Sequence, residues 1–267
     1  MKKVFEITAD SRGGITQPDL SIRIGAGHFA YAVTDHGSGS LDQLSYYTGN
    51  GSDSKQVADI IDQSAVINQS FYNTRICYDY PGYILVPAAG LRHEDAVAAM
   101  LMPQSGMTTI TELLANWQLY EVFTVPAEIH QLFTRKFPSA KCFNQVGIQL
   151  KNTDAGLEGG CIELDIRHDD FSILAARSGK LFIAQVFEYS TPEDVLYYLL
   201  SICRQFSFSQ DDVQLNISGL VDKQSSLYKE LYQYFAAICF RDTSWNMKGT
   251  EYPSHFFTSL NDLATCG

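Results

Sequence analysis

The sequence lacks long apolar runs, and this absence limits where the protein can reside. No stretch of about 20 apolar residues occurs anywhere in the chain, as a membrane-spanning helix would require. The opening Met-Lys-Lys resembles the start of a signal peptide, but Glu6 and Asp10 interrupt the residues that follow. We therefore expect a cytoplasmic protein with no membrane insertion.

Basic residues are also scarce. The chain has 19 Lys and Arg against 30 Asp and Glu, which gives a formal net charge of −11. Such a surface repels phosphate backbones, so we expect no nucleic-acid partner. Charged residues are only 18% of the chain and hydrophobic residues are 45%, so 267 residues can build two folded domains of ordinary size.

Paired cysteines and the common catalytic motifs are absent as well. None of the six cysteines forms a Cys-x-x-Cys pair, so we interpret them as reduced, buried thiols. Walker A, Gly-x-Ser-x-Gly, His-Glu-x-x-His and dinucleotide fingerprints do not occur. Because consecutive residues rarely converge on one ion, His168-Asp169-Asp170 is interpreted as a solvated turn. We expect no metal site and no catalytic residue.

Alternating and helical apolar patterns predict the elements of the first half. Residues Leu20 to Asp35 predict two antiparallel strands, interrupted at Gly25-Ala26-Gly27-His28. The later elements expected are a strand from Leu41 to Tyr47, a helix from Ser54 to Asn68, strands Thr74 to Tyr78 and Tyr83 to Val86, a helix from His93 to Met102, a strand Tyr120 to Val125 and a helix from Pro126 to Phe137.

The second half shows a similar order of elements. Thr191-Pro192-Glu193-Asp194 is typical of a helix start, with a capping hydroxyl, a proline and two acids. The other elements expected are strands Cys161 to Ile166, Phe171 to Ala176, Leu181 to Phe187, Val213 to Ile217 and Ile238 to Phe240, with a further helix marked by Leu227, Leu231 and Phe235.

The two halves also match as an internal repeat. A shift of 142 residues brings Ile24 onto Ile166 and Phe29 onto Phe171 without a gap. The same shift brings Gly37 onto Gly179, Gln43 onto Gln185 and Tyr47 onto Tyr189. Each half then reads as three strands, helix, strand, helix, strand.

This order predicts an α/β fold of two subdomains, residues 1–150 and 151–267. Each would hold a five-stranded mixed sheet with flanking helices, which is the ribonuclease-H-like plan. Two such sheets leave a cleft between them, and the turn after the first strand of each half would face it. Exposed aromatics, with Tyr46-Tyr47 and Phe256-Phe257 as candidates, would indicate a protein partner, although core packing explains most aromatic positions better.

A doubled unit of this order resembles the actin-like ATPase superfamily, which includes sugar kinases, Hsp70 chaperones and pilus-assembly proteins. More closely, the chain is similar to a bacterial family, domain of unknown function family 3822. The resembling segments are Leu20 to Asp35, Tyr197-Tyr198-Leu199-Leu200, Leu215-Asn216-Ile217-Ser218-Gly219, and Leu227-Tyr228 through Tyr234-Phe235.

The resemblance implies a nucleotide site that this sequence keeps only in fragments. In ATPases of the superfamily each turn carries Asp-x-Gly, whose Asp organises Mg²⁺ through water while the glycines let backbone amides approach phosphates. The first half keeps Gly25 and Gly27, but Arg23 replaces the Asp. The second half keeps Asp165, but Arg167, His168 and Asp169 replace the glycine-rich turn and would crowd a phosphate.

Two functions remain open from these fragments. Ser218-Gly219 partly resembles the superfamily's adenosine-binding Gly-Gly, although a strand-to-helix turn needs one glycine in any case. The hypothesis favoured is a non-catalytic pseudo-ATPase that acts as a scaffold or interaction module without a cofactor. A separate hypothesis pairs Asp165 with Arg23 across the cleft, which would close the site with an internal ion pair. The alternative is an ATP-binding switch or ATP-dependent enzyme with an atypical phosphate site, built from Arg23, Gly25, Gly27, Asp165, Ser218 and Gly219.

Overall fold

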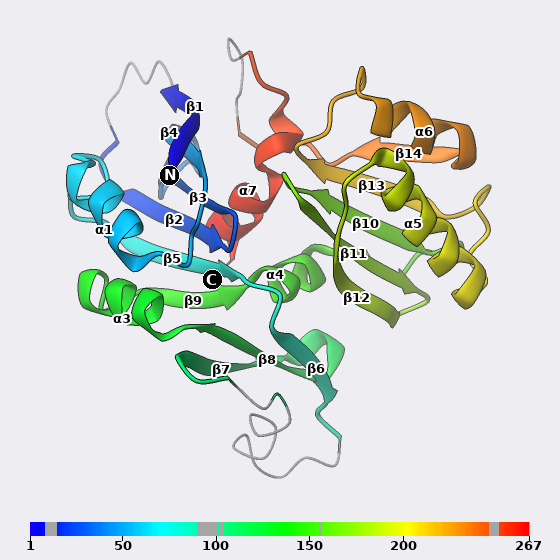
Figure 1. Ribbon diagram of the computed structural model, residues 1–267, viewed down its shortest axis with the longest axis horizontal. Helices are drawn as coiled ribbons and strands as arrows, with labels where there is room; N and C mark the ends of the chain where they lie inside the picture. The colour runs from blue at the N-terminus through cyan, green and yellow to red at the C-terminus, as the bar shows by residue number, and fades with distance from the viewer. Residues whose placement is uncertain (9–14, 90–100, 102–103, 155, 246–250, 267) are drawn as a thin grey trace. The chain divides into compact units, whose positions relative to one another are not determined.

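The structure, a computed structural model, describes residues 1–8, 15–89, 101, 104–154, 156–245 and 251–266. The chain forms two compact units (Figure 1): unit 1 holds Met1–Lys151, and unit 2 holds Asn152–Asp262. The sequence assigned the whole C-terminal end to the second half, whereas residues 263–266 belong to unit 1. The helix expected from His93 to Met102 lies outside the described residues.

Unit 2 has the mixed five-stranded sheet that the sequence predicts. Its strand order is β12-β11-β10-β13-β14, with β10, β11 and β12 antiparallel and β13 and β14 parallel to β10. The bounds are β10 (Cys161–Ile166), β11 (Asp170–Arg177), β12 (Lys180–Glu188), β13 (Gln214–Gly219) and β14 (Ala237–Phe240), with helices α5 (Pro192–Phe206) and α6 (Ser226–Tyr234).

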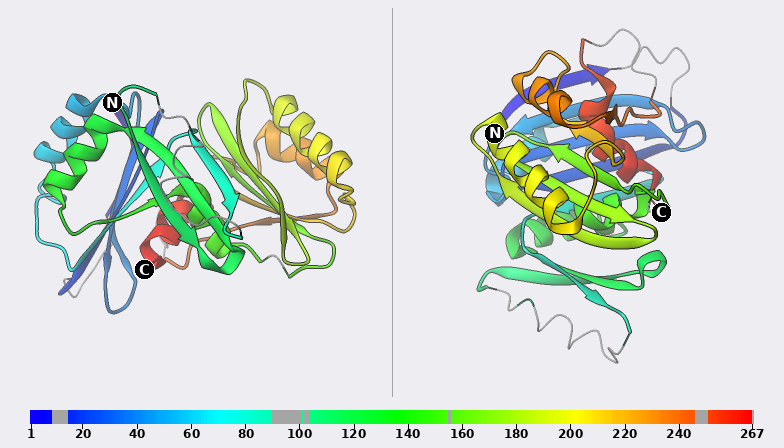
Figure 2. Two further views of the ribbon diagram at one scale, coloured as in Figure 1. Left: turned by 90° about the horizontal axis from the view of Figure 1, so that it is seen from below. Right: turned by 90° about the vertical axis from the view of Figure 1, so that its right-hand side faces the viewer.

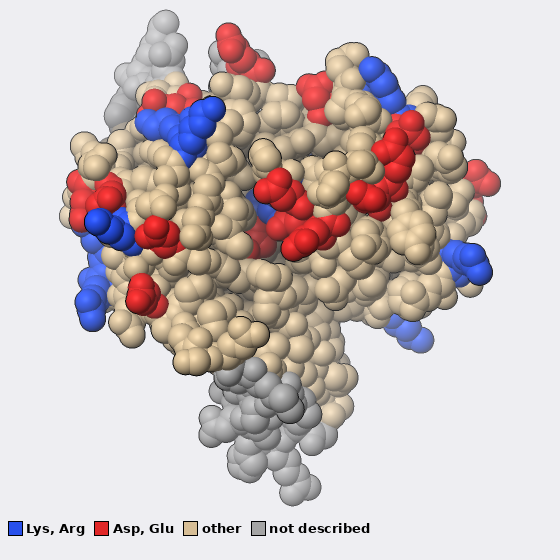
Figure 3. Space-filling view, in the orientation of Figure 1, with Lys and Arg blue, Asp and Glu red and all other residues tan. Residues whose placement is uncertain are grey.

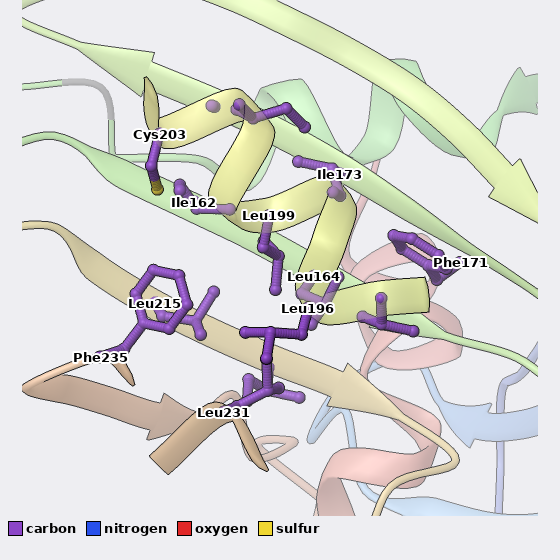
Figure 4. Close-up of a cluster of buried hydrophobic side chains, with 14 of the residues drawn as sticks. Ile162, Leu164, Phe171, Ile173, Leu196, Leu199, Cys203, Leu215, Leu231 and Phe235 are labelled. Carbon is purple, nitrogen blue, oxygen red and sulfur yellow. The ribbon is translucent and has the colours of Figure 1, made fainter. Parts of the chain in front are cut away.

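The core of unit 2 lies between this sheet and its two helices. Alternation along β10 directs Ile162 and Leu164 to the helical face, where Leu199 of α5 and Leu231 of α6 cover them (Figure 4). Helix α5 begins as predicted, because Thr191 and Asp194 form a capping box. Figure 2 shows both helices on one face of the sheet.

Unit 1 repeats this plan with one added strand. Its sheet has the order β1-β4-β3-β2-β5-β9, in which the last five strands correspond to β12-β11-β10-β13-β14. The bounds are β1 (Lys2–Thr8), β2 (Pro18–Gly25), β3 (His28–Asp35), β4 (Leu41–Thr48), β5 (Asn73–Asp79) and β9 (Lys141–Asn144), with helices α1 (Ser54–Gln63), α3 (Ala127–Lys136) and α4 (Gln145–Asn152). Helices α1 and α3 cover one face (Figure 2).

Three of these elements differ from the sequence-based expectation. Strand β1 was missed because most of its side chains are exposed, so it shows little apolar alternation. Helix α4 was also not predicted. Helix α1 ends at Gln63 instead of Asn68, because Asn68 turns back and its amide donates to the carbonyls of Ile61 and Ser64.

A separate three-stranded sheet lies within unit 1, and the sequence did not predict it. The order is β6-β8-β7, and both pairings are antiparallel. The bounds are β6 (Tyr83–Pro87), β7 (Met107–Leu114), η1 (Ala115–Trp117) and β8 (Leu119–Pro126). Strands β6 and β8 were expected as strands, but nothing in the sequence assigned them to a second sheet.

The internal repeat is confirmed for the first hairpin and wrong for the second. Ile24 pairs with Phe29, and Ile166 pairs with Phe171, as the shift of 142 requires. In the next strand Phe29 pairs with Tyr47 but Phe171 pairs with Phe187, so Tyr47 corresponds to Phe187 and not to Tyr189. The cause is loop length, because residues 36–40 connect β3 to β4 whereas only Ser178 and Gly179 connect β11 to β12.

The chain ends in η2 (Ser254–Phe257) and α7 (Thr258–Thr265). Tyr46, Tyr47 and Phe257 are buried, so the aromatic positions proposed as exposed mostly belong to the interior. Among the described helices, none is both long and apolar enough to cross a membrane. On the face drawn in Figure 3, lysines and arginines form scattered spots, not a continuous basic patch.

Candidate functional site

The first predicted turn joins β2 to β3 and consists of Ala26 and Gly27. Gly25 precedes it, where a Cβ atom would overlap the backbone oxygen of Asp79 and the ring of His28. At Gly27 a Cβ would meet nothing within 4 Å. Backbone carbonyls of this turn accept hydrogen bonds from Gly49 and Gly51 at 3.0 and 2.9 Å. Gly25 is therefore required by close packing of β2 against β5.

Arg23 is buried and bound to a carboxylate of its own unit. Its side chain is 5% exposed, and its Nη2 and Nε atoms lie 2.7 and 3.1 Å from Oδ2 of Asp79. His28 Nε2 lies 3.5 Å from the same oxygen. Parallel pairing of β2 with β5 produces this cluster, since it places Gly25 opposite Asp79 at the carboxyl ends of both strands.

Asp79 is a site residue that the sequence analysis did not single out. The sequence held part of the information needed to identify Asp79. Asp79 ends the strand that follows the first helix, as Gly219 ends the corresponding strand of the second half. The sequence could not pair it with Arg23, because 56 residues separate the two positions.

In unit 2 the structure brings three of the predicted site residues together. Parallel pairing of β10 with β13 sets Asp165 opposite Ser218 and Ile166 opposite Gly219. The Ser218 hydroxyl donates to Oδ1 of Asp165 at 3.1 Å, and Asp165 is only 1% exposed. These residues occupy the carboxyl ends of adjacent parallel strands, where ligands bind in open α/β sheets.

Gly219 has a backbone conformation that favours glycine. Its φ angle is +85°, in the left-handed region. A Cβ atom there would overlap the carbonyl oxygen of Ile166 and come within 2.9 Å of Oδ1 of Asp165. The carbonyl of Ile166 also accepts the amide of Leu220 at 2.7 Å. The backbone at the end of β13 thus requires a glycine at position 219, as expected if Ser218-Gly219 belongs to a turn that needs one glycine.

The turn after β10 differs from the crowding that the sequence suggested. His168 and Asp169 point to solvent, with side-chain exposures of 69% and 82%. Arg167 instead turns inward, and its Nη1 lies 3.4 Å from Oδ2 of Asp165. The guanidinium also contacts the Asp170 carboxylate, and the Tyr189 hydroxyl donates to the Arg167 carbonyl at 2.8 Å. The positively charged guanidinium of Arg167 therefore lies beside Asp165, the one carboxylate kept from the Asp-x-Gly element.

A second buried polar cluster on β10 was missed by the sequence analysis. Asn216 donates to Glu163 Oε1 at 2.9 Å, and Arg241 lies 3.4 Å from Glu163 Oε2 and 2.9 Å from Asp262 Oδ2. Burial raises the pKa of Glu163, while Arg241 opposes that rise. Burial alone would lower the pKa of Arg241, but Asp262 and Glu163 raise it.

Alternation places Glu163 and Asp165 on the same face of β10, opposite the helical core. Arg241 also lies close enough to Asp165 to interact with it electrostatically. Glu163 and Asp165, the two acids that β10 places on this face, therefore each lie beside an arginine. The pairing of Asp165 with Arg23 stays a prediction.

Comparison with known proteins decides the family. The model of a family described as "Protein of unknown function (DUF3822)" matches residues 11–238, which is more than half of the chain. The chain belongs to this family. No curated protein sequence matches the chain. The DUF3822 relationship predicted from Leu20 to Asp35 and from the segments between Tyr197 and Phe235 is therefore confirmed.

Solved structures identify the fold of this DUF3822 protein. A Bacteroides thetaiotaomicron protein with an actin-like ATPase fold and unknown function superposes with a TM-score of 0.78 at 17% identity, covering 94% of this chain and 96% of that one. The PilM–PilN type IV pilus biogenesis complex gives 0.63 at 14% identity, covering 92% and 97%. The ethanolamine utilization protein EutJ from Carboxydothermus hydrogenoformans gives 0.50 at 10% identity, covering 94% and 90%. The DUF3822 chain therefore has the actin-like ATPase fold, as predicted.

Proposed function

We propose that this protein is a non-catalytic, actin-like interaction module of the bacterial cytoplasm, with a degenerate nucleotide site. The observation that carries the proposal is the contact between Arg167 and Asp165, at 3.4 Å. In the superfamily an Asp at this position organises a magnesium ion through water. A guanidinium beside the buried carboxylate neutralises it and repels a divalent cation.

The first half supports the same proposal. Arg23 stands where the resemblance places the other magnesium-organising Asp, and it is bound to Asp79 at 2.7 Å. A buried arginine held by a carboxylate has lost much of its ability to bind a phosphate. Arg23 and Asp165 therefore do not fit Mg²⁺–ATP as the superfamily holds it.

An interaction role has separate support. One solved structure with this fold is a complex of PilM with PilN, so the fold can serve protein assembly. Three tyrosines on the helices of unit 2 are exposed, by 67% at Tyr197, 69% at Tyr232 and 43% at Tyr234. Exposed tyrosines are typical of protein interfaces, because they bury a large area with few rotatable bonds.

The proposal predicts no ATP turnover. Purified protein is expected to release phosphate from Mg²⁺–ATP no faster than its Asp165→Asn variant, prepared in the same way to match contaminating activity. The reason is that neither turn can place magnesium beside a triphosphate. Phosphate release that saturates with ATP and disappears in Asp165→Asn would contradict the proposal.

A further inference from the structure

Glu121 is a buried acid that the proposed function does not use. It lies in the middle strand of the β6-β8-β7 sheet and is 0% exposed. Within the part of the chain that the structure describes, neither of its carboxyl oxygens meets the geometry of a hydrogen bond, and the nearest donor is the amide of Gly147. Buried polar groups are nearly always paired, so a carboxyl group with two unpartnered oxygens indicates an unusual state of the side chain.

A helix packs directly against this carboxyl group. Gly147 of α4 faces Glu121, and a Cβ atom at Gly147 would overlap Oε2. The glycine therefore allows α4 to approach the acid closely. Residues Gln145 to Leu150 of α4 are buried, so the carboxyl group lies against a buried segment on this side.

If both Glu121 and its neighbour Glu112 were ionised, the charged groups around them would leave one negative charge uncompensated. Glu112 of β7 is its direct cross-strand partner. Lys151 of α4 lies 2.6 Å from Oε1 of Glu112, whereas Oε2 of Glu112 is buried and has no hydrogen-bond partner among the described residues. On β6 the opposing residue is Leu85. Cys77 of β5 also interacts with Glu121, and burial raises the pKa of that thiol well above its usual value, so it carries no charge.

Electrostatics then decide the protonation state of Glu121. Burial raises its pKa to about 8, and the neighbouring Glu112 adds to the rise. The amide of Gly147 and the Lys151 ammonium oppose it without cancelling it. At neutral pH Lys151 neutralises Glu112, and Glu121 retains its proton.

We propose that Glu121 is a proton-binding site that controls the packing of α4 against the β7–β8 hairpin. With the proton bound, the neutral acid fits against Gly147. When the proton leaves, an anion whose one nearby donor is the Gly147 amide faces both the α4 backbone and Glu112, and α4 loosens. Because α4 is the last element of unit 1 before the chain enters unit 2 at Asn152, this proton regulates the segment that links the two units.

The direction of the pH effect follows from linkage. The folded state holds the Glu121 proton up to about pH 8, whereas the unfolded chain releases it near the ordinary pKa of a glutamate, 4.5. The stability that the Glu121 proton contributes is therefore fully present below the pKa of Glu121 in the unfolded chain. It is lost as pH rises through the pKa of Glu121 in the folded protein. For one proton the folding equilibrium constant falls up to tenfold per pH unit within that window.

The test compares wild-type protein with Glu121→Gln, which resembles the neutral acid and cannot ionise. Urea unfolding between pH 6 and 8 should show a folding constant that falls up to about 100-fold more in wild type than in the variant. Hydrogen exchange in α4, corrected for intrinsic rates, should accelerate above pH 8 in wild type alone. The control Glu158→Gln, at an exposed position, should behave as wild type.

A measurement on wild-type protein makes the proposal independent of the variant's stability. Infrared spectroscopy at pH 7 should show the carbonyl band of a protonated carboxylic acid, which disappears above pH 9. Absence of this band would overturn the proposal, as would an equal pH dependence in Glu121→Gln. A pH dependence that added sodium or magnesium ions abolish would assign the carboxyl pair to a cation instead of a proton, which also overturns it.

Discussion

Replacing Gly219 with alanine is expected to destabilise the protein strongly. At a φ angle of +85° an alanine costs about 1–2 kcal/mol relative to glycine. Its Cβ would also overlap the carbonyl oxygen of Ile166 and approach Asp165, and such overpacking adds about 1–3 kcal/mol. We expect a loss of roughly 2–5 kcal/mol in the free energy of unfolding, measured by urea denaturation.

Gly27 provides the matched control, because it is also a glycine of the predicted nucleotide site. A Cβ at Gly27 meets nothing within 4 Å, so Gly27→Ala should change stability by no more than about 0.5 kcal/mol. Equal stability of Gly219→Ala and wild type, with a loss of nucleotide binding, would mean that Gly219 serves a ligand instead of the strand end.

Replacing Arg23 with alanine is expected to have an effect of similar size. The substitution removes the guanidinium that lies 2.7 Å from the Asp79 carboxylate, where both side chains are at most 7% exposed. Removing one partner of a buried ion pair typically costs about 3–5 kcal/mol, because a charge remains in a poorly solvated place. Thermal or urea unfolding measures this loss directly.

Lys136→Ala serves as the control for Arg23→Ala. Lys136 pairs with Asp62 at 3.3 Å, but the two side chains are 34% and 72% exposed. Exposed ion pairs contribute about 0–1 kcal/mol, so this variant should remain close to wild type. If Arg23→Ala were as stable as Lys136→Ala and lost ATP affinity instead, Arg23 would be a phosphate ligand.

The repeated sheet could be predicted from sequence because its signals are local. Strand β10 alternates apolar and polar residues, β11 contains a short apolar run, and Thr191-Pro192 marks the start of α5 within a few residues. The alignment of Ile24 with Ile166 could also be found from the sequence alone, because it needs only the constant shift of 142 residues between the two halves. Edge strand β1 gives a weaker signal, since most of its side chains are exposed and Ile7 is its one buried residue.

The candidate site could be predicted only in part, because its contacts join distant segments. Arg23, Asp165 and Gly219 were found as fragments of a known element, whereas their partners were not. Asp79 lies 56 residues from Arg23, and parallel pairing of β2 with β5 brings them together. The inward turn of Arg167 depends on a rotamer choice that the residue type does not determine.

The proposed interaction role requires that the two turns have lost the ability to hold a triphosphate. Thermal unfolding in the presence of increasing Mg²⁺–ATP tests this claim most directly, because a ligand at 100 times its dissociation constant stabilises a protein by about 2.7 kcal/mol. We predict no change in the unfolding temperature up to millimolar ATP. A saturable rise that disappears in Asp165→Asn would contradict the proposed loss of nucleotide binding and support the ATP-binding switch.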